Sequence, residues 1–240
     1  MMTIVRSRAV VALILCVALS AAGCAATRAR RDEPERSGFL GDYSQLAPEK
    51  GYEAQLVYVN PSAAWSRYDS IYLHSVTLWE DEETAKLSPQ DQKMLTDLFY
   101  KALHDELGTY FTLVDHPTAR SIAVRAALTQ ARGAKVALRT VSSFVPQALV
   151  LSTATGLATD TAATVGSASA ELEVLDAITN ERLAAAVDAR AGTKTPFTTR
   201  TFSKWADVEA ACDRWAERSA SFLIRQGVRT KPGAPPAPKE

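Results

Sequence analysis

Alternation of apolar and polar residues predicts two long strands in the second half of the chain. Every second position is apolar from Ser167 to Asp176, and the alternation returns from Glu181 to Ala191. A strand with this period turns one set of side chains to each face. Because the turn residues Thr179-Asn180 lie between the segments, the pattern predicts a β-hairpin. Four charged residues are expected to form cross-strand pairs on an exposed face of this hairpin, namely Glu171, Glu173, Asp188 and Arg190.

Other segments are rich in β-branched, aromatic or alternating apolar residues and predict further strands. Tyr68–Trp79 is apolar on both faces, which favours a central position in the sheet. Phe111–Val114 is expected to be a short strand, and Ser121–Gln130 alternates in the same way as the hairpin. Tyr52–Val59 predicts a short edge strand that ends where Asn60-Pro61 begins a turn.

Two segments carry apolar residues at steps of three and four, which predicts amphipathic helices. The first has Ser88 as its N-cap and is expected to end at Gly108. The second begins near Ser203, ends at Gly227 and places Cys212 on its buried stripe. The stripes consist of Leu95, Leu98, Phe99, Ala102, Leu103 and Leu107 in the first helix, and of Trp205, Val208, Cys212, Trp215, Ser219 and Phe222 in the second.

The order of these elements predicts the fold class. Several strands, one helix, the hairpin and a final helix fit an α+β domain, a two-layer sandwich of a mainly antiparallel sheet with both amphipathic helices on one face. Residues 133–166 interrupt the pattern with small apolar residues and threonines. They predict either a long loop or loose helix over the sheet, or an apolar patch that faces a partner or lipid.

The N-terminus has the composition of an export signal. Arg6 and Arg8 precede an uncharged, apolar run from Ala9 to Ala22. This run is shorter than the roughly 20 residues that a membrane-spanning helix needs. It has the length and the flanking residues of a secretory signal peptide.

The signal ends in Leu19-Ser20-Ala21-Ala22-Gly23-Cys24, which resembles the lipobox of bacterial lipoproteins. The resemblance implies cleavage between Gly23 and Cys24 and acylation of Cys24 with palmitate-like chains, although Ala21 stands where the pattern prefers leucine. Two acyl chains supply stable membrane attachment. By resemblance to Gram-negative sorting signals, alanine at position 25 implies the outer membrane, on its periplasmic face. Ordinary signal cleavage without a lipid is the alternative.

Composition divides the chain into four parts. Residues 1–23 form the signal peptide, and residues 24–37 comprise the acylated cysteine and a charged tether that is expected to be disordered. Residues 38–229 form a single domain, which starts with an irregular arm at 38–46. Residues 230–240 are rich in proline and predict a disordered tail.

Charge and cysteine content narrow the class of protein. The chain has 27 basic and 27 acidic residues, and the signal peptide removes two of the basic ones, so the remainder is slightly acidic. A nucleic-acid-binding protein would carry a clustered basic surface, and no nucleic-acid partner is expected. Cys16 leaves with the signal and Cys24 is acylated, so Cys212 has no disulfide partner in the chain.

Candidate catalytic and metal-binding residues are few. His74, His104 and His116 lack the spacing of metal ligands, and no nucleophile motif or phosphate-binding loop is present. Four acids at 80–83 lack the glycine turn of a calcium loop, and a solvated loop is expected there. Three aromatic residues are expected in the core rather than at a sugar-binding site, namely Trp65, Tyr68 and Tyr72. We therefore assign no catalytic residue, metal or cofactor.

Three segments resemble an uncharacterised bacterial lipoprotein family, domain of unknown function 3313 (DUF3313). They are residues 39–46 (FLGDYSQL), 171–176 (ELEVLD) and 181–192 (ERLAAAVDARAG). The resemblance extends over about residues 38–227 and implies an envelope lipoprotein, without an activity or catalytic residues to transfer. More weakly, the order of elements is similar to that of curli-secretion lipoproteins and of the Tol-system periplasmic protein, which are interaction modules.

Three functions remain open at this point. The leading hypothesis is a membrane-anchored, non-catalytic interaction or assembly module that binds an envelope protein or itself through the sheet face or residues 133–166. The second is a periplasmic binder or carrier of a lipid or other small apolar ligand, with residues 133–166 lining the site. The third is an envelope hydrolase whose nucleophile and base come together only in the fold.

Overall fold

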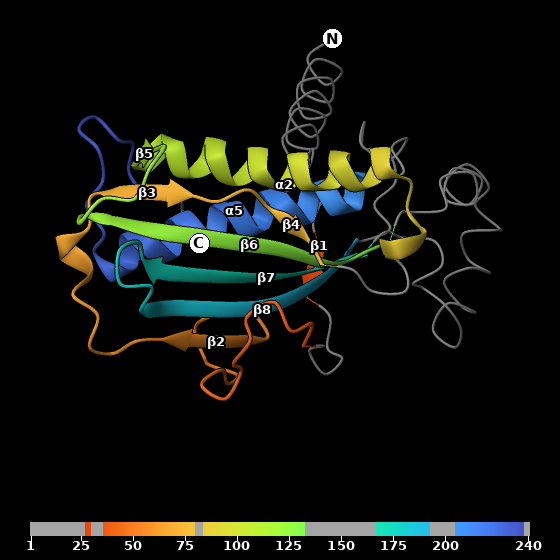
Figure 1. Ribbon diagram of the computed structural model, residues 1–240, viewed down its shortest axis with the longest axis horizontal. Coiled ribbons are helices and arrows are strands. Elements are labelled where there is room, and N and C mark those ends of the chain that lie inside the picture. The colour runs from red at the N-terminus through yellow and green to blue at the C-terminus, as the bar shows by residue number, and fades with distance from the viewer. Residues whose placement is uncertain (1–26, 30–35, 80–83, 133–166, 193–204, 238–240) are drawn as a thin grey trace, which may run out of the picture.

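One mixed β-sheet and two long helices form the domain in the computed structural model (Figure 1), which describes residues 27–29, 36–79, 84–132, 167–192 and 205–237. Among these residues eight strands follow the order β1-β8-β7-β6-β3-β5, with β2 beside β8 and β4 beside β6. The strands are β1 (Thr27–Ala29), β2 (Leu56–Val59), β3 (Ser70–Leu73), β4 (Thr77–Leu78), β5 (Thr112–Val114), β6 (Ser121–Arg132), β7 (Ser167–Asp176) and β8 (Arg182–Gly192). The helices are α2 (Pro89–Tyr110) and α5 (Ala206–Gln226), with 3-10 turns η1 (Trp65–Arg67) and η2 (Thr84–Lys86).

The predicted hairpin lies at the centre of the sheet. β7 is antiparallel to both β8 and β6, and the register of the hairpin places Glu171 opposite Val187. On the other side of β6, however, β3 and β4 run parallel to β6, and β5 runs parallel to β3. The α+β class is confirmed, but the sheet is mixed. β5 is parallel to β3 because α2 carries the chain from the end of β4 back to the end of the sheet where β3 begins.

The segment predicted as one strand from Tyr68 to Trp79 contains two strands, β3 and β4. The backbone N–H of His74 donates to the carbonyl of Val124 (3.0 Å), and that of Trp79 donates to the carbonyl of Leu128 (2.8 Å). The whole segment therefore follows β6. β3 lies between β5 and β6, which gives it the central position that its apolar residues predicted.

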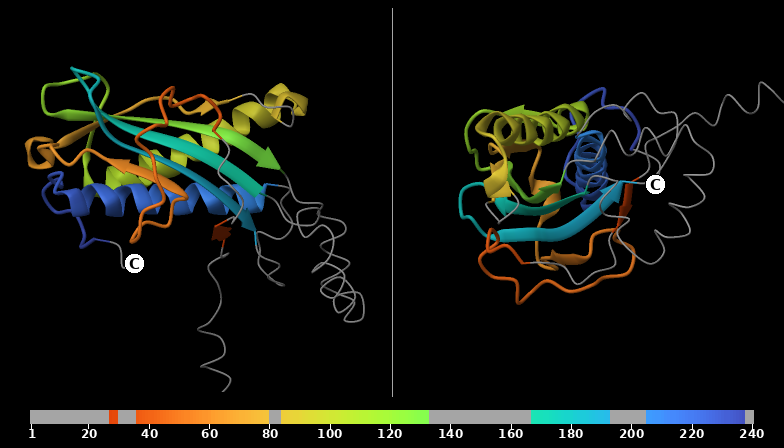
Figure 2. Two further views of the ribbon diagram at one scale, coloured as in Figure 1. Left: turned by 90° about the horizontal axis from the view of Figure 1, so that it is seen from below. Right: turned by 90° about the vertical axis from the view of Figure 1, so that its right-hand side faces the viewer.

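Both helices cover the same face of the sheet, and the main core lies between them and the strands (Figure 2). Leu95 and Phe99 of α2 have no exposed surface, and Ile122 faces them from β6. The rings of Phe99 and Trp215 pack with centroids 5.5 Å apart, which joins α2 to α5. Cys212 is 1% exposed on the buried stripe of α5, as predicted.

Local contacts explain where the helices begin and end. The hydroxyl of Ser88 accepts a hydrogen bond of 3.1 Å from the backbone N–H of Asp91, which confirms the predicted N-cap. α2 continues past Gly108, so the prediction of a C-cap there is wrong. Gly108 is not among the glycines with a positive φ, and a Cβ there would lie 3.4 Å from the side chain of Leu113, an ordinary contact. Gly227 does end α5, with a φ of 92°.

The N-terminal arm covers the opposite face of the sheet (Figure 2). Leu40, Tyr43 and Leu46 are buried there against Ala185 and Val187 of β8, which forms a second, smaller core. The irregular arm predicted at residues 38–46 therefore packs against the sheet.

The four hairpin charges that were expected on an exposed face are buried instead, and they lie on both faces of the sheet. Glu171 is 0% exposed and Glu173 4%, and both contact residues on the side of the arm. Asp188 is 2% exposed and Arg190 4%, and both lie on the side of α5. Alternation shows which residues share a face of a strand, but it does not show what covers that face, so the prediction of exposure fails.

Both ends of the chain contain residues that were expected to be disordered. Thr27–Ala29 form β1, which pairs antiparallel with the end of β8. Beyond α5, the backbone N–H of Lys231 donates to the carbonyl of Tyr110 (2.8 Å). Backbone hydrogen bonds hold these segments without large apolar side chains, which is why their composition suggested disorder.

Candidate functional site

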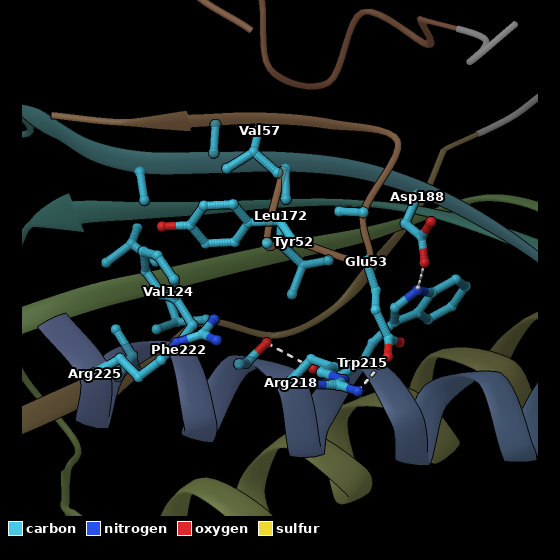
Figure 3. A pocket seen from close by; sticks show the side chains of 18 of the residues that line it. Tyr52, Glu53, Val57, Val124, Leu172, Asp188, Trp215, Arg218, Phe222 and Arg225 are labelled. Atoms are coloured by element: carbon cyan, nitrogen blue, oxygen red, sulfur yellow. Dashed lines mark hydrogen bonds and ion pairs between the residues drawn. The ribbon is translucent and has the colours of Figure 1, made fainter. Parts of the chain in front are cut away.

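A cavity of about 120 Å³ lies between α5 and the face of the sheet that α5 covers. Figure 3 shows side chains from three parts of the chain converging on it. α5 supplies one wall, strands β6, β7 and β8 supply the opposite wall, and the segment Gly51–Ala54 before β2 closes one side. The labelled side chains around the space are Tyr52, Glu53, Val57, Val124, Leu172, Asp188, Trp215, Arg218, Phe222 and Arg225.

Small side chains on β8 leave this space open. Ala184 and Ala186 line the cavity opposite Val174 and Leu172 of the neighbouring strand. Protein interiors are otherwise packed closely, so larger residues at these alanines would fill the gap between strand and helix. Leu172 and Val174 are only half-buried although α5 lies over them. The walls are therefore apolar and reached by solvent.

One end of the cavity is charged. The carboxylate of Glu53 accepts hydrogen bonds from Arg214 (2.8 Å) and Arg190 (3.1 Å), and it also pairs with Arg218. Burial alone would raise the pKa of Glu53, but the three guanidinium groups together hold it below its ordinary value. Glu53 is therefore ionised near neutral pH and ties the segment before β2 to α5.

Asp188 lies in the lining at the same end. Its Oδ2 accepts hydrogen bonds from Nε of Arg190 (2.7 Å) and from Nε1 of Trp215 (2.8 Å). Its Oδ1 is buried without a hydrogen-bond partner among the described residues, and so is Nε of Arg218. Burial raises the pKa of Asp188, and the contacts with Arg190 and Trp215 offset only part of this effect. One buried acceptor and one buried donor at the lining are thus unsatisfied, which suits a polar group of a ligand.

The other end of the cavity is aromatic. The rings of Tyr52 and Phe222 have centroids 6.1 Å apart, and Phe222 also meets Trp65 edge to face at 5.7 Å. The guanidinium of Arg225 lies over the ring of Tyr52 at 5.5 Å. A molecule in this cavity would therefore meet rings at one end and charges at the other.

A second group of charges lies on the opposite face of the sheet, beneath the arm. The hydroxyl of Tyr43 donates to Glu171 (2.6 Å), and Glu173 accepts from Arg125 (2.9 Å) and Arg182 (2.7 Å). Arg182 also donates to two backbone carbonyls of the arm, at 2.6 and 2.7 Å. These groups satisfy one another, so this cluster fastens the arm to the sheet.

Several predicted sites lie outside the described residues. Gly23 and Cys24 are among them, as are the rest of the signal peptide, the acidic segment 80–83, residues 133–166 and Ser203. Among the residues that the structure does describe, no helix has the length and apolar character to cross a bilayer.

The three histidines lie apart from the cavity. His104 and His116 are exposed beside neighbouring aspartates, and the ring of His74 packs against that of Tyr72 at 4.6 Å. Burial, and then the charge of Arg125, lower the pKa of His74. In the described part of the chain, no group of histidine, cysteine and acidic side chains is arranged to hold a metal ion.

The remaining candidates of the sequence analysis are part of the core. Burial of Cys212 raises the pKa of its thiol. Trp65 and Tyr68 are buried, as expected, whereas Tyr72 is half-buried.

Sequence reasoning missed the cavity and its charged rim. The signals were present as five alanines in β8 and as Arg214 and Arg218 on α5, but neither is informative alone. Alanines in a strand do not show that a helix covers the strand and leaves a gap above them. Arg214 and Arg218, four positions apart, look like part of a solvated helix face until Glu53 is known to meet both.

Comparison with known proteins identified a family model and similar solved structures. No curated protein sequence matched the chain. Two crystal forms of a PelC dodecamer from Paraburkholderia phytofirmans align with 66% of this chain. One has 11% identity, a TM-score of 0.36 and 91% of PelC covered, and the other has 12% identity, a TM-score of 0.35 and 92% covered. These values bear on neither the ligand nor the assembly of this chain.

A family model described as "Protein of unknown function (DUF3313)" matches residues 35–219. The match includes the arm and both hairpin strands, which are the segments that carried the resemblance. It confirms the family that those segments predicted. The chain therefore belongs to the DUF3313 family, whose function is unknown.

Proposed function

We propose that the protein is a membrane-anchored lipoprotein of the bacterial envelope whose domain is a non-catalytic module that binds a small apolar ligand. The acyl chains on Cys24 hold it at the periplasmic face of the outer membrane. The cavity beneath α5 carries the ligand-binding part of this proposal, because apolar walls with a few convergent polar groups are typical of small-molecule sites.

The size of the cavity limits the ligand. An engineered apolar cavity of about 150 Å³ takes up benzene. A space of about 120 Å³ therefore suits a single ring or a short aliphatic chain. The site that we propose is formed by β7, β8 and α5; residues 133–166, which the sequence suggested as its lining, lie outside the described residues.

The position of β1 supports direct anchoring of the domain. Thr27 follows Cys24 by three residues and is already paired with β8. An extended chain spans at most about 3.6 Å per residue. Acyl chains on Cys24 would therefore keep this end of the sheet within roughly 10 Å of the lipid.

The anchor is tested by intact mass and membrane fractionation of the wild-type chain beside Cys24→Ala. We expect an acylated wild-type protein that sediments with the outer membrane and an unacylated variant that does not. A wild-type protein of unmodified mass in the soluble periplasmic fraction would contradict the anchor, without touching the cavity.

Ligand binding is tested by calorimetric titration of the full chain carrying Cys24→Ala with 1-hexanol, a neutral probe of suitable size. Ala186→Leu fills the cavity and should weaken binding at least about tenfold, while it keeps or raises the melting temperature because it adds apolar contacts. Ala85→Leu, at an exposed alanine of η2, is the matched control. No binding to the parent chain, or equal binding to the Ala186→Leu variant, would refute this site.

A second candidate function, an interaction or assembly module, is favoured by the outer surface of α2. Pro89, Met94 and Leu98 line a shallow apolar hollow there, edged by Lys93 and Lys101. An apolar centre with a charged rim is common at interfaces between proteins. Crosslinking of the anchored protein in cells tests this candidate with Leu98→Glu as the variant. A crosslinked species that persists unchanged in the variant would reject this surface.

A further inference from the structure

Three arginines at the charged end of the cavity share one carboxylate. Glu53 is the shared partner of Arg190, Arg214 and Arg218. Arg190 also has Asp188, and Arg214 also reaches Glu217 at 3.4 Å. Arg218, which lines the cavity, has Glu53 as its partner through Nη2, while its buried Nε donates to no described group.

The carboxylate that fills this cradle of Arg190, Arg214 and Arg218 comes from a segment without regular structure. Glu53 lies between Gly51, which has a φ of 93°, and the start of β2. Its side chain is 41% exposed, whereas that of Arg190 is 4% exposed. The arginines are therefore fixed on β8 and α5, and the anion between them is the most exposed member of the group.

Three guanidinium groups beside an apolar cavity form a site that suits an amphipathic acid, which has a carboxylate at one end and an apolar chain at the other. Guanidinium groups bind carboxylates through paired, charge-assisted hydrogen bonds. The apolar part of such an acid would lie against Leu172 and Phe222 while its head reached the arginines. The unsatisfied Nε of Arg218 provides a donor for an added oxygen.

We propose that the cradle of Arg190, Arg214 and Arg218 recognises the carboxylate of a short apolar acid, and that Glu53 occupies the place of that carboxylate when the cavity is empty. This inference rests on the proposed ligand-binding function and specifies the chemistry of the ligand. Entry of the acid moves the side chain of Glu53 outward, toward solvent, and leaves the fixed arginines in place.

The test compares hexanoate with 1-hexanol, which has the same chain length and no charge, by calorimetric titration of the full chain carrying Cys24→Ala. Glu53→Gln removes the competing charge and should tighten hexanoate binding about tenfold while hexanol binding changes little. Arg218→Gln should weaken hexanoate binding about tenfold and spare hexanol. Asp97→Asn, which removes a paired carboxylate from the exposed face of α2, is the control and should change neither.

The outcomes separate this inference from the function on which it rests. Equal affinity for hexanoate and hexanol in every variant would overturn the cradle and leave the cavity as a site for neutral ligands. Absence of binding for both probes in every variant would overturn both proposals. Weaker hexanoate binding by the Glu53→Gln variant than by the parent chain would overturn the proposal that Glu53 competes with the acid. If Arg218→Gln lowers the melting temperature strongly, Arg218→Lys, which keeps the charge but loses the paired geometry, repeats the measurement.

A series from butanoate to decanoate then shows how much of an acid the cavity accepts. An optimum near six carbons supports a free short acid, as the volume of about 120 Å³ suggests. Affinity that rises steadily to decanoate would overturn the short-acid assignment and indicate the end of a longer acyl chain.

Discussion

The hydroxyl of Tyr43 donates a hydrogen bond of 2.6 Å to Oε2 of Glu171, a residue with no exposed surface. Tyr43 belongs to the N-terminal arm and Glu171 to β7, 128 positions apart in the chain. The other oxygen of Glu171 accepts from the backbone N–H of Ser37 at 2.9 Å. Two of the three segments on which the family resemblance rested are therefore in direct contact, and this contact fastens the arm to the sheet.

Loss of the Tyr43 hydroxyl should destabilise the domain. Tyr43→Phe leaves an oxygen of buried Glu171 without its donor, which costs about 1–3 kcal/mol in free energy of unfolding. Denaturant unfolding followed by circular dichroism measures the change. Tyr58→Phe, at a residue that packs against the same small core, is the control and should stay within about 0.5 kcal/mol of wild type. Equal effects of the two variants would contradict the structural role of the Tyr43–Glu171 contact.

Asp176 should make stability depend on acid pH. Burial would raise the pKa of Asp176, but the backbone N–H groups of Thr179 and Ile178 and the hydroxyl of Tyr68 hold it below its ordinary value of 3.8. A lowered pKa in the folded state contributes stability that is complete above about pH 3.8 and is lost as the pH falls through the folded pKa.

The variant Asp176→Asn isolates this contribution. At pH 7 its free energy of unfolding should be about 1–3 kcal/mol lower than that of wild type, because a neutral amide accepts these hydrogen bonds less strongly. The gap should close as the pH falls below the ordinary pKa of the carboxyl. Unfolding curves at a series of pH values provide the measurement, and a gap that stays constant down to pH 2 would show that Asp176 is not the group responsible.

Cys212 should react with thiol reagents only when the domain opens. The side chain is 1% exposed, and its burial raises the pKa of the thiol far above neutral pH. Alkylation with iodoacetamide, read by mass spectrometry of the peptide that contains Cys212, should be negligible in native buffer and complete in denaturant. Alkylation in native buffer at the rate of a free thiol would show that α5 does not stay packed on the sheet.

If Cys24 is acylated as we propose, the protein should present one end of its sheet to the membrane. β1 and the end of β8 lie at the same end as η2, whereas the hairpin turn with Ile178 lies at the other (Figure 1). In vesicles with headgroup-labelled quencher lipids, a fluorophore at Ala85→Cys should be quenched more than one at Ile178→Cys. Both residues are exposed.

A ten-residue glycine and serine insertion after Cys24 is the control. It should reduce the difference in quenching between the two positions, because it lengthens the short connection between the lipid and β1. Equal quenching without the insertion would contradict the orientation, while the mass of the protein independently reports acylation.

Much of the secondary structure could be predicted from periodicity. β7, β8 and the stripes of α2 and α5 were recognisable because each repeats the geometry of its own backbone, with a period of two or about 3.6. Ser88 and Gly227 were predictable ends, because their side-chain and backbone requirements are local. Gly108 was not an end, because its φ is not positive and α2 runs through it to Tyr110.

The partners of the hairpin charges could not be predicted in the same way. Glu171 and Asp188 show the same alternation in the sequence, yet one meets the arm and the other meets Trp215 of α5. Their burial depends on which distant segment covers each face of the sheet. The parallel strands beside β6 and the pairing of β1 with β8 likewise depend on how the chain returns to the sheet.

The sequence by itself determined the two amphipathic helices, the hairpin and the family, because these are encoded in short stretches of neighbouring residues. The export signal with its Gly23-Cys24 junction is encoded in the same local way and stays a prediction. Only the tertiary structure decided that both faces of the sheet are covered, that alanines of β8 leave a cavity beneath α5, and that Glu53 meets three arginines there. The physical reason is that packing and ion pairing act through space between residues far apart in the chain, and no local pattern records which of them come together.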